Sequence, residues 1–127
     1  MGKIIEQVKL INALDPSKSE IVEAVVDTGA TLLVLPQDLV ERLGLRKVRE
    51  AKVRYANQDV QSKAVYGIVT VEVQGRSGNF DALAEVPGSQ PLIGQIVLEA
   101  LDLVINPVTR KLGPNPESPE MPMVEIL

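Results

Sequence analysis

Hydrophobic and polar residues alternate along much of the chain, in short segments that end in glycine, proline or polar clusters. Such alternation is typical of a β-strand with one buried face, because successive side chains of a strand point to opposite sides. The clearest example is residues 68–74, where valine occupies positions 69, 71 and 73 and mainly polar residues lie between them. Residues 4–12 show a similar alternation and predict the first strand.

Three further segments are apolar on nearly both faces, which is typical of strands inside a domain. They are residues 21–26, 31–35 and 103–105. Less regular alternation predicts strands at residues 46–55, 60–66 and 79–86. A polar turn at residues 56–59 joins the first two of these, and Gly75–Gly78 closes a hairpin into the third.

Two short helices interrupt this pattern. The first follows Pro36, which suits the first turn of a helix, and ends near Gly44, where a C-cap belongs. The second covers residues 95–101. The sequence therefore predicts an all-β domain with one or two short helices at residues 1–112, followed by a proline-rich arm at residues 113–127.

The predicted arm ends in an apolar segment. Residues 114–127 contain four of the nine prolines, three acids and no base. Proline stiffens the chain into an extended spacer, so we expect the arm to reach outward rather than fold back. Because apolar residues return only at Met121–Leu127, we expect a strand there that pairs with a second copy. The alternative is a disordered acidic tail.

The composition narrows the chemistry that the chain can perform. A chain of 127 residues, 45% of them hydrophobic, is sufficient for one domain with an aliphatic core, since only Tyr55, Tyr66 and Phe80 are aromatic. Cysteine and histidine are absent, which excludes disulfides, thiolate nucleophiles and imidazole ligands. We therefore expect no metal site and no cofactor, and proton transfer near neutral pH falls to carboxylates, lysine or tyrosine.

Charge and hydropathy narrow the choice of partners. Thirteen basic and seventeen acidic residues give a net charge of −4, which argues against nucleic acid or an anionic membrane as a partner. No segment resembles a signal peptide or a transmembrane helix. We expect a cytoplasmic protein.

One acid is distinguished by its surroundings. In Val25–Thr31, an apolar run ends in Asp27, Thr28 and Gly29, and a second apolar run follows at once. Burial penalises an ionised carboxylate, so an acid between two apolar runs usually has a function. The alternative is a turn in which the aspartate bonds to its own backbone. These residues alone leave both interpretations open.

The order of these features resembles the retropepsin-like aspartic proteases, which comprise the retroviral proteases and their cellular and bacterial relatives. The resemblance is carried by Val25–Thr31 and by the later Leu92–Gly94 with the helix and strand that follow it. It extends over about residues 4–112. It implies a closed, barrel-like sheet of mostly antiparallel strands, with the active site on the twofold axis of a homodimer.

The resemblance also implies an aspartic endopeptidase that acts on polypeptides, with roles for individual residues. Asp27 is the catalytic carboxylate. The active-site loop continues through Thr28, which hydrogen-bonds to the partner subunit, Gly29, which leaves room for the substrate backbone, and Ala30. The tip of the flap hairpin that covers the cleft comprises Tyr55, Ala56, Asn57 and Gln58. A late loop that supports the site comprises Leu92, Ile93 and Gly94.

A single Asp-Thr-Gly accounts for this chemistry only if two chains combine. Hydrolysis of a peptide without a metal or a covalent nucleophile needs a base for the water and an acid for the carbonyl oxygen. Two carboxylates that share one proton supply both. Four other aspartates are in surface-like contexts, namely Asp38, Asp59, Asp81 and Asp102. The second catalytic acid is therefore expected from a second copy of Asp27.

The chain departs from the retroviral pattern at two places. Retroviral members usually carry an arginine after the late glycine, paired with an acid two residues after the early glycine, whereas this chain has Gln95 and Thr31. The flap tip lacks the glycines of the viral enzymes and has Ala56–Asp59 instead. These departures bear on the support of the dimer and on substrate scope.

Two other functions remain as alternatives at this point. One is a retropepsin-fold domain used for dimerisation or peptide binding, with little or no turnover. The other is an unrelated small β-barrel binding module, for which Leu92–Gly94 and its helix would be coincidental. An exposed Asp27 remote from any dimer axis would favour this second alternative.

Overall fold

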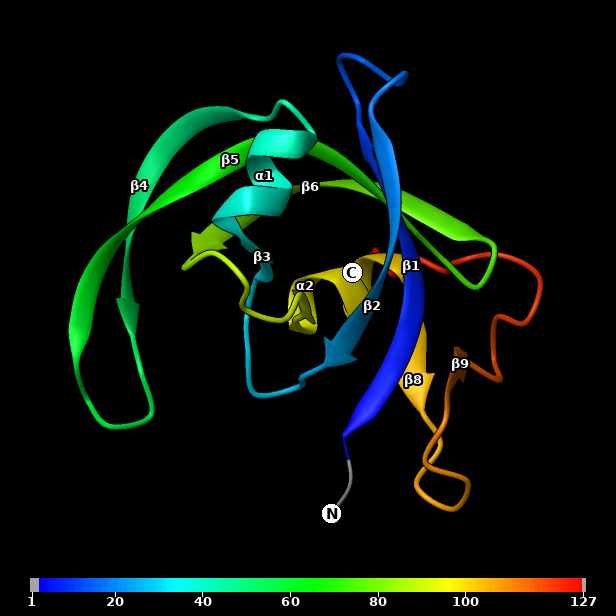
Figure 1. The fold of residues 1–127 in the computed structure, drawn as a ribbon. Helices are drawn as coiled ribbons and strands as arrows, with labels where there is room; N and C mark the ends of the chain where they lie inside the picture. The colour runs from blue at the N-terminus through cyan, green and yellow to red at the C-terminus, as the bar shows by residue number, and fades with distance from the viewer. Residues whose placement is uncertain (1–2, 127) are drawn as a thin grey trace.

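The computed structural model describes residues 3–126, and its elements follow the predicted order closely (Figure 1). The strands are β1 (Ile4–Asn12), β2 (Ser19–Val26), β3 (Leu33–Pro36), β4 (Arg46–Arg54), β5 (Val60–Val73), β6 (Arg76–Glu85), β7 (Leu92–Ile93), β8 (Leu103–Ile105) and β9 (Leu112–Pro114). The helices are α1 (Gln37–Arg42) and α2 (Gln95–Leu101). In this part of the chain, neither helix is long and apolar enough to cross a membrane.

Seven strands form one mixed sheet that closes on itself. The strand order is β1-β2-β7-β3-β6-β5-β4, and β1 also pairs with β5. This additional pairing, Lys9↔Glu72 to Asn12↔Val69, joins two distant strands of the order and produces a barrel. The pairs β2–β7 and β3–β6 are parallel and the others are antiparallel. The closed, mostly antiparallel barrel predicted from the sequence is therefore confirmed.

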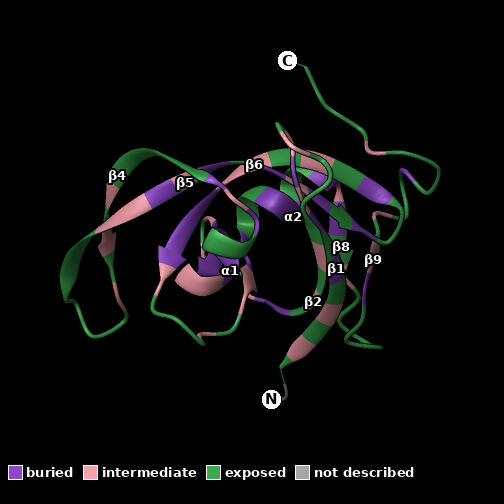
Figure 2. Ribbon diagram, turned by 45° about the horizontal axis from the view of Figure 1, so that its top comes forward, coloured by how far each residue is buried: buried purple, intermediate pink, exposed green. Residues whose placement is uncertain are grey.

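The interior of the barrel is aliphatic, as the composition predicts. Its buried hydrophobic side chains are all Val, Leu, Ile or Ala. The valines at positions 69, 71 and 73 are at most 1% exposed, and the polar residues between them face outward. Both helices pack against the core through Leu39, Val40, Val97 and Leu101. Figure 2 shows this buried interior beside β4, which is mostly exposed.

The structure corrects the prediction around residues 60–86. We expected separate strands at 60–66 and 68–74, but β5 runs unbroken through Gly67, which pairs with Arg46 on β4. The hairpin into β6 turns at Gln74 and Gly75 rather than across Gly75–Gly78. Both residues have positive φ, at 50° and 78°, which is the geometry of the two-residue loop that matches strand twist.

Two loops far apart in sequence are held together below the end of β2. The Asp27 N–H donates to the Ile93 carbonyl at 3.0 Å, and the Gln95 N–H donates to the Ala30 carbonyl at 2.8 Å. A third bond joins the Ile96 N–H to the Thr31 carbonyl at 2.9 Å. These main-chain bonds join the segments that carry Gln95 and Thr31, the two positions where retroviral members have an ion pair.

Gly94 allows this close approach because it has no side chain. A Cβ at Gly94 would lie 2.7 Å from the Ala30 carbonyl oxygen and 2.8 Å from the Thr31 carbonyl carbon, and it would also meet the Leu32 carbonyl oxygen. All three obstacles are backbone atoms, which cannot rotate away. The absence of a side chain at Gly94 therefore lets the loop that carries Asp27 pack against this segment and form the main-chain bonds.

The C-terminal arm follows a different path from the predicted one. Gly113 and Pro114 belong to β9, which pairs with β8, so the predicted boundary after Leu112 falls within a strand. Residues 115–118 then fold back, and Ser118 is buried where its hydroxyl bonds to the Asp102 carboxylate. The expected outward spacer is wrong at this point, because polar bonds to Arg76 and Asp102 hold the chain. Residues 121–126 contain no strand in the single chain, and their pairing with a second copy stays a prediction.

We expect Gly94→Ala to destabilise the fold by about 3 kcal/mol, because the new methyl group has no space that side-chain rotation can provide. Chemical denaturation measured by circular dichroism tests this expectation. Gly113→Ala is the matched control, since a Cβ there meets no atom within 4 Å. Similar stability of the two variants would contradict the tight loop packing.

Candidate active site

Asp27 lies immediately after β2, at the start of the loop that Gly94 supports. Its Oδ1 accepts a hydrogen bond from the Gly29 N–H at 2.9 Å, and its carbonyl accepts one from the Ala30 N–H at 3.2 Å. Asp27 thus forms a turn by bonding to the backbone of its own loop, and its carboxyl group also lines the cleft. Asp27 is only half-buried in the single chain, because the loop lies at the molecular surface. Its environment is less desolvated than the flanking apolar runs suggest.

A cleft of about 570 Å³ begins at Asp27. The active-site loop forms one side of the cleft, the end of β4 and the flap form another, and β6 and β7 supply Leu83, Glu85 and Leu92. Of the residues predicted from the sequence, the cleft brings together Asp27, Gly29, Ala30, Tyr55, Ala56 and Leu92. These come from three separate parts of the chain, so the fold assembles them.

The other predicted residues lie around the cleft rather than on its wall. Thr28 is exposed and lines a neighbouring hollow. Asn57 and Gln58 are exposed at the tip of the flap, while Ile93 and Gly94 are buried behind the active-site loop. Their positions agree with supporting roles in the same region, and their functional roles stay predictions.

The flap is the hairpin formed by β4 and β5, which extends away from the barrel in Figure 1. At its tip, the Tyr55 N–H donates to the Asp59 carbonyl at 2.9 Å, and the Gln58 N–H donates to the Tyr55 carbonyl at 2.9 Å. The Asn57 side chain bonds to both the Asp59 carboxylate and the Asp59 N–H, each at 3.0 Å. Side-chain bonds thus shape a tip that has no glycine.

Sequence analysis missed Glu85, which belongs to a polar network in the cleft wall. Glu85 Oε2 accepts a hydrogen bond from the Tyr55 hydroxyl at 2.6 Å, and Oε1 pairs with Lys63 Nζ at 3.1 Å. Burial raises the pKa of the Glu85 carboxyl, but the bonds from Tyr55 and Lys63 outweigh burial and leave this pKa below its usual value. The three residues are far apart in sequence, so only strand pairing could have revealed the network.

The four aspartates expected at the surface lie outside the cleft. Asp59 is exposed, and Asp38 bonds to Arg42 and to the Gly88 N–H. Asp102 holds the start of the arm through Ser118, Asn115 and the Met123 N–H. These bonds, the one from Ser118 foremost, lower the pKa of the Asp102 carboxyl.

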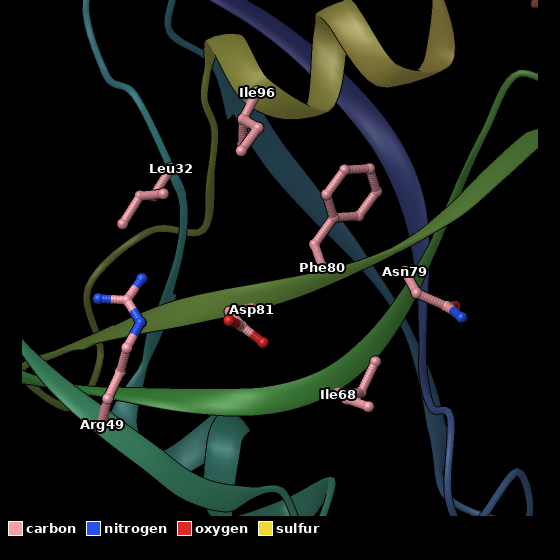
Figure 3. A pocket seen from close by; sticks show the side chains of 7 residues that line it. All are labelled: Leu32, Arg49, Ile68, Asn79, Phe80, Asp81 and Ile96. Atoms are coloured by element: carbon pink, nitrogen blue, oxygen red, sulfur yellow. The ribbon is translucent and has the colours of Figure 1, made fainter.

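Asp81, the fourth aspartate, lies in a second hollow of about 260 Å³ (Figure 3). Its wall combines Arg49 and Asn79 with the apolar side chains Leu32, Ile68, Phe80 and Ile96. Leu32 also lines the main cleft, so the two hollows are neighbours. Asp81 is half-buried, in less polar surroundings than the sequence suggests.

Thr28 faces a third hollow of about 380 Å³, formed with α2 and β8. Among residues 3–126, strand β8 pairs with β9 alone, so its second edge has no strand partner in this part of the chain. Val104 on β8 is 38% exposed. Within residues 3–126, no three acidic side chains gather as ligands for a metal ion.

Comparisons with known proteins agree with this geometry. Residues 18–107 match the model of a family described as "gag-polyprotein putative aspartyl protease". Among solved structures, the chain is similar to the EIAV protease complexed with the inhibitor HBY-793, with a TM-score of 0.57 and 18% identity over 78% of this chain and 88% of that one. No curated protein sequence matches the chain. The family match includes both the Asp27 loop and the loop at Leu92–Gly94. The chain therefore belongs to the gag-polyprotein aspartyl protease family and has the retropepsin-like fold.

Proposed function

We propose that the protein is a homodimeric aspartic endopeptidase in which Asp27 and its copy in a second subunit form the catalytic dyad. The observation that carries this proposal is the content of the cleft, whose wall has two carboxyl groups, Asp27 and Glu85. Both oxygens of Glu85 are engaged by Tyr55 and Lys63. Asp27 makes no salt bridge within the described residues, so it is the carboxylate available for reaction.

The chemistry requires a second carboxyl group beside Asp27. One carboxylate deprotonates the attacking water, while a protonated carboxyl donates to the carbonyl oxygen of the scissile peptide bond. Two aspartates in contact supply both forms, because repulsion between like charges keeps one proton on the pair. Glu85 is a poor candidate for the acid, since its lowered pKa disfavours the protonated form. A second copy of Asp27 meets the requirement.

The surface beside Asp27 supports the proposed dimer. Thr28 is exposed there, next to the unpaired edge of β8 and the partly exposed Val104. An unpaired strand edge with apolar side chains is stabilised by pairing with another chain. A twofold axis near Thr28 would bring two copies of Asp27 together and cover both edges.

The cleft is suited to an extended polypeptide. Its apolar wall includes Leu32, Val34, Val53, Leu83 and Leu92, which provide surfaces for apolar side chains. Gly29 lies in the active-site loop, where the missing side chain allows a backbone to approach Asp27. The flap strand β4 borders the same space through Lys52–Arg54. Polypeptide substrates therefore fit the shape and the polarity of the cleft.

We expect Asp27→Asn to reduce hydrolysis of unstructured peptides at least about 100-fold, because the amide can act neither as base nor as proton donor. Stability should change by less than about 1 kcal/mol, since the swap is nearly isosteric and preserves the acceptor for the Gly29 N–H. Asp15→Asn, in an exposed turn, is the control. Wild-type turnover by the Asp27 variant would refute the catalytic role, and an inactive wild type would favour a binding domain.

The shared dyad also makes the Asp27→Asn chain an inhibitor of the wild type. When equal amounts of the two chains are mixed and exchange freely, the activity of the wild-type chains should fall to about half, because mixed dimers carry one aspartate. Peptide cleavage before and after exchange measures this effect. Undiminished activity after exchange, with sedimentation showing mixed dimers, would show that one Asp27 is sufficient.

A further inference from the structure

One carboxylate connects both strands of the flap to the barrel. Tyr55 directly follows β4, Lys63 lies on β5, and Glu85 is the last residue of β6. Each oxygen of Glu85 takes one donor, at 2.6 Å from the tyrosine hydroxyl and 3.1 Å from the ammonium group. The Lys63 and Glu85 side chains are 20% and 19% exposed, so the ion pair is largely removed from solvent.

The three groups reinforce one another electrostatically. The hydrogen bond to Glu85 raises the pKa of the Tyr55 hydroxyl, and the bond to the same carboxylate raises the pKa of the Lys63 ammonium group. The Glu85 pKa is lowered despite burial. A lowered acid pKa and raised tyrosine and lysine pKa values mean that the bonded forms persist across the neutral range. The network weakens in acid as Glu85 takes up a proton, and in strong alkali as Tyr55 or Lys63 loses one.

The network lies where the flap projects beyond the barrel. Toward the tip, the pairing of β5 with β6 ends at Val65↔Leu83. Arg54 and Val60 form the last pair of the hairpin, between β4 and β5. The Asn57 side chain bonds to Asp59 within the turn itself and does not reach the barrel. Within the described residues, the Tyr55–Glu85 hydrogen bond is thus the side-chain bond that ties the tip to the barrel.

The same network forms part of the cleft wall. Tyr55 and Glu85 both line the cleft that contains Asp27, whereas Lys63 supports Glu85 from the neighbouring strand. Packing of the flap on the barrel is already provided by Ala51 and Val53, which contact the small apolar cluster around Val65. A desolvated carboxylate is costly and is not needed for that packing. Because Glu85 lines the cleft and bonds to Tyr55 of the flap, it is placed to hold the flap close to a bound substrate.

We propose that Tyr55, Glu85 and Lys63 are positioning residues that hold the flap over the cleft and thereby set the affinity for the polypeptide substrate. This inference rests on the proposed peptidase function. Loss of the network leaves the flap tip without its tie to β6, so bound substrate is covered less well. The groups at Asp27 that carry out the reaction are unchanged.

Kinetics with Tyr55→Phe and Glu85→Ala test the role in substrate binding. We expect KM to rise about 5- to 10-fold in each, as expected for a lost bond to a charged group, while kcat changes less. Glu85→Gln should restore part of the affinity, because its amide oxygen still accepts from Tyr55. Tyr66→Phe, which removes the hydroxyl of the second tyrosine outside the cleft, should match the wild type. An unchanged KM in both Tyr55→Phe and Glu85→Ala would overturn the proposal.

Tyrosine titration tests the network without requiring turnover. The chain has two tyrosines and no tryptophan, so in Tyr66→Phe the ultraviolet signal of tyrosine ionisation reports Tyr55 alone. We expect a Tyr55 pKa above the usual value, and a lower one after Glu85→Gln in the same background. An ordinary Tyr55 pKa in an active enzyme would overturn the network. A raised pKa in a protein without peptidase activity would overturn the proposed function and leave the Tyr55–Glu85 contact standing.

Discussion

The contact between the active-site loop and residues 93–96 determines the arrangement of the rest of the site. Asp27 stands at the end of a strand, and a strand end is fixed only if the chain beyond it is held. Here the backbone of Ile93, Gln95 and Ile96 bonds to the loop on both sides of Gly29. Such a contact between two backbones is possible only where no Cβ intervenes, which is the role of Gly94. Main-chain bonds thus join the segments that an ion pair joins in retroviral members.

This support holds the active-site loop in place within a single chain, whereas the proposed dyad needs two chains. The loop, the cleft and the flap are all present, and the carboxyl group of Asp27 is half-buried at the surface. In the proposed dimer its catalytic partner is the Asp27 of the second subunit. The same face carries the unpaired edge of β8. The proposed association of two copies would bury the acid further and cover the unpaired strand edge at the same surface.

The flap is held to the barrel less extensively than the active-site loop is held to residues 93–96. Its strands are joined by regular pairing, but its tip extends beyond the barrel and is shaped by its own side chains. One carboxylate connects this tip to β6. Because the Tyr55 hydroxyl donates to a carboxylate, this bond is stronger than one between neutral groups. The arm is secured differently, by the buried Ser118, whose carbonyl accepts from the guanidinium of Arg76. The same guanidinium also donates to the carbonyl groups of Leu101 and Asp102.

The sequence by itself determined most of the longer strands, both helices and the aliphatic core, and it singled out Asp27, because each follows from local periodicity or from a short motif. It also excluded thiol and imidazole chemistry, since those residues are absent. It did not predict the short strands β7 and β9, which depend on pairing with distant partners. The tertiary structure decided everything that depends on pairing between distant strands. Nothing in the sequence around Glu85 distinguishes it from other acids. Only the folded chain places Lys63 of β5 and Tyr55 of the flap beside it. The continuous β5 and the folded-back Ser118 were likewise set by long-range pairing and bonding, whose free energy outweighs the local preferences of glycine and proline.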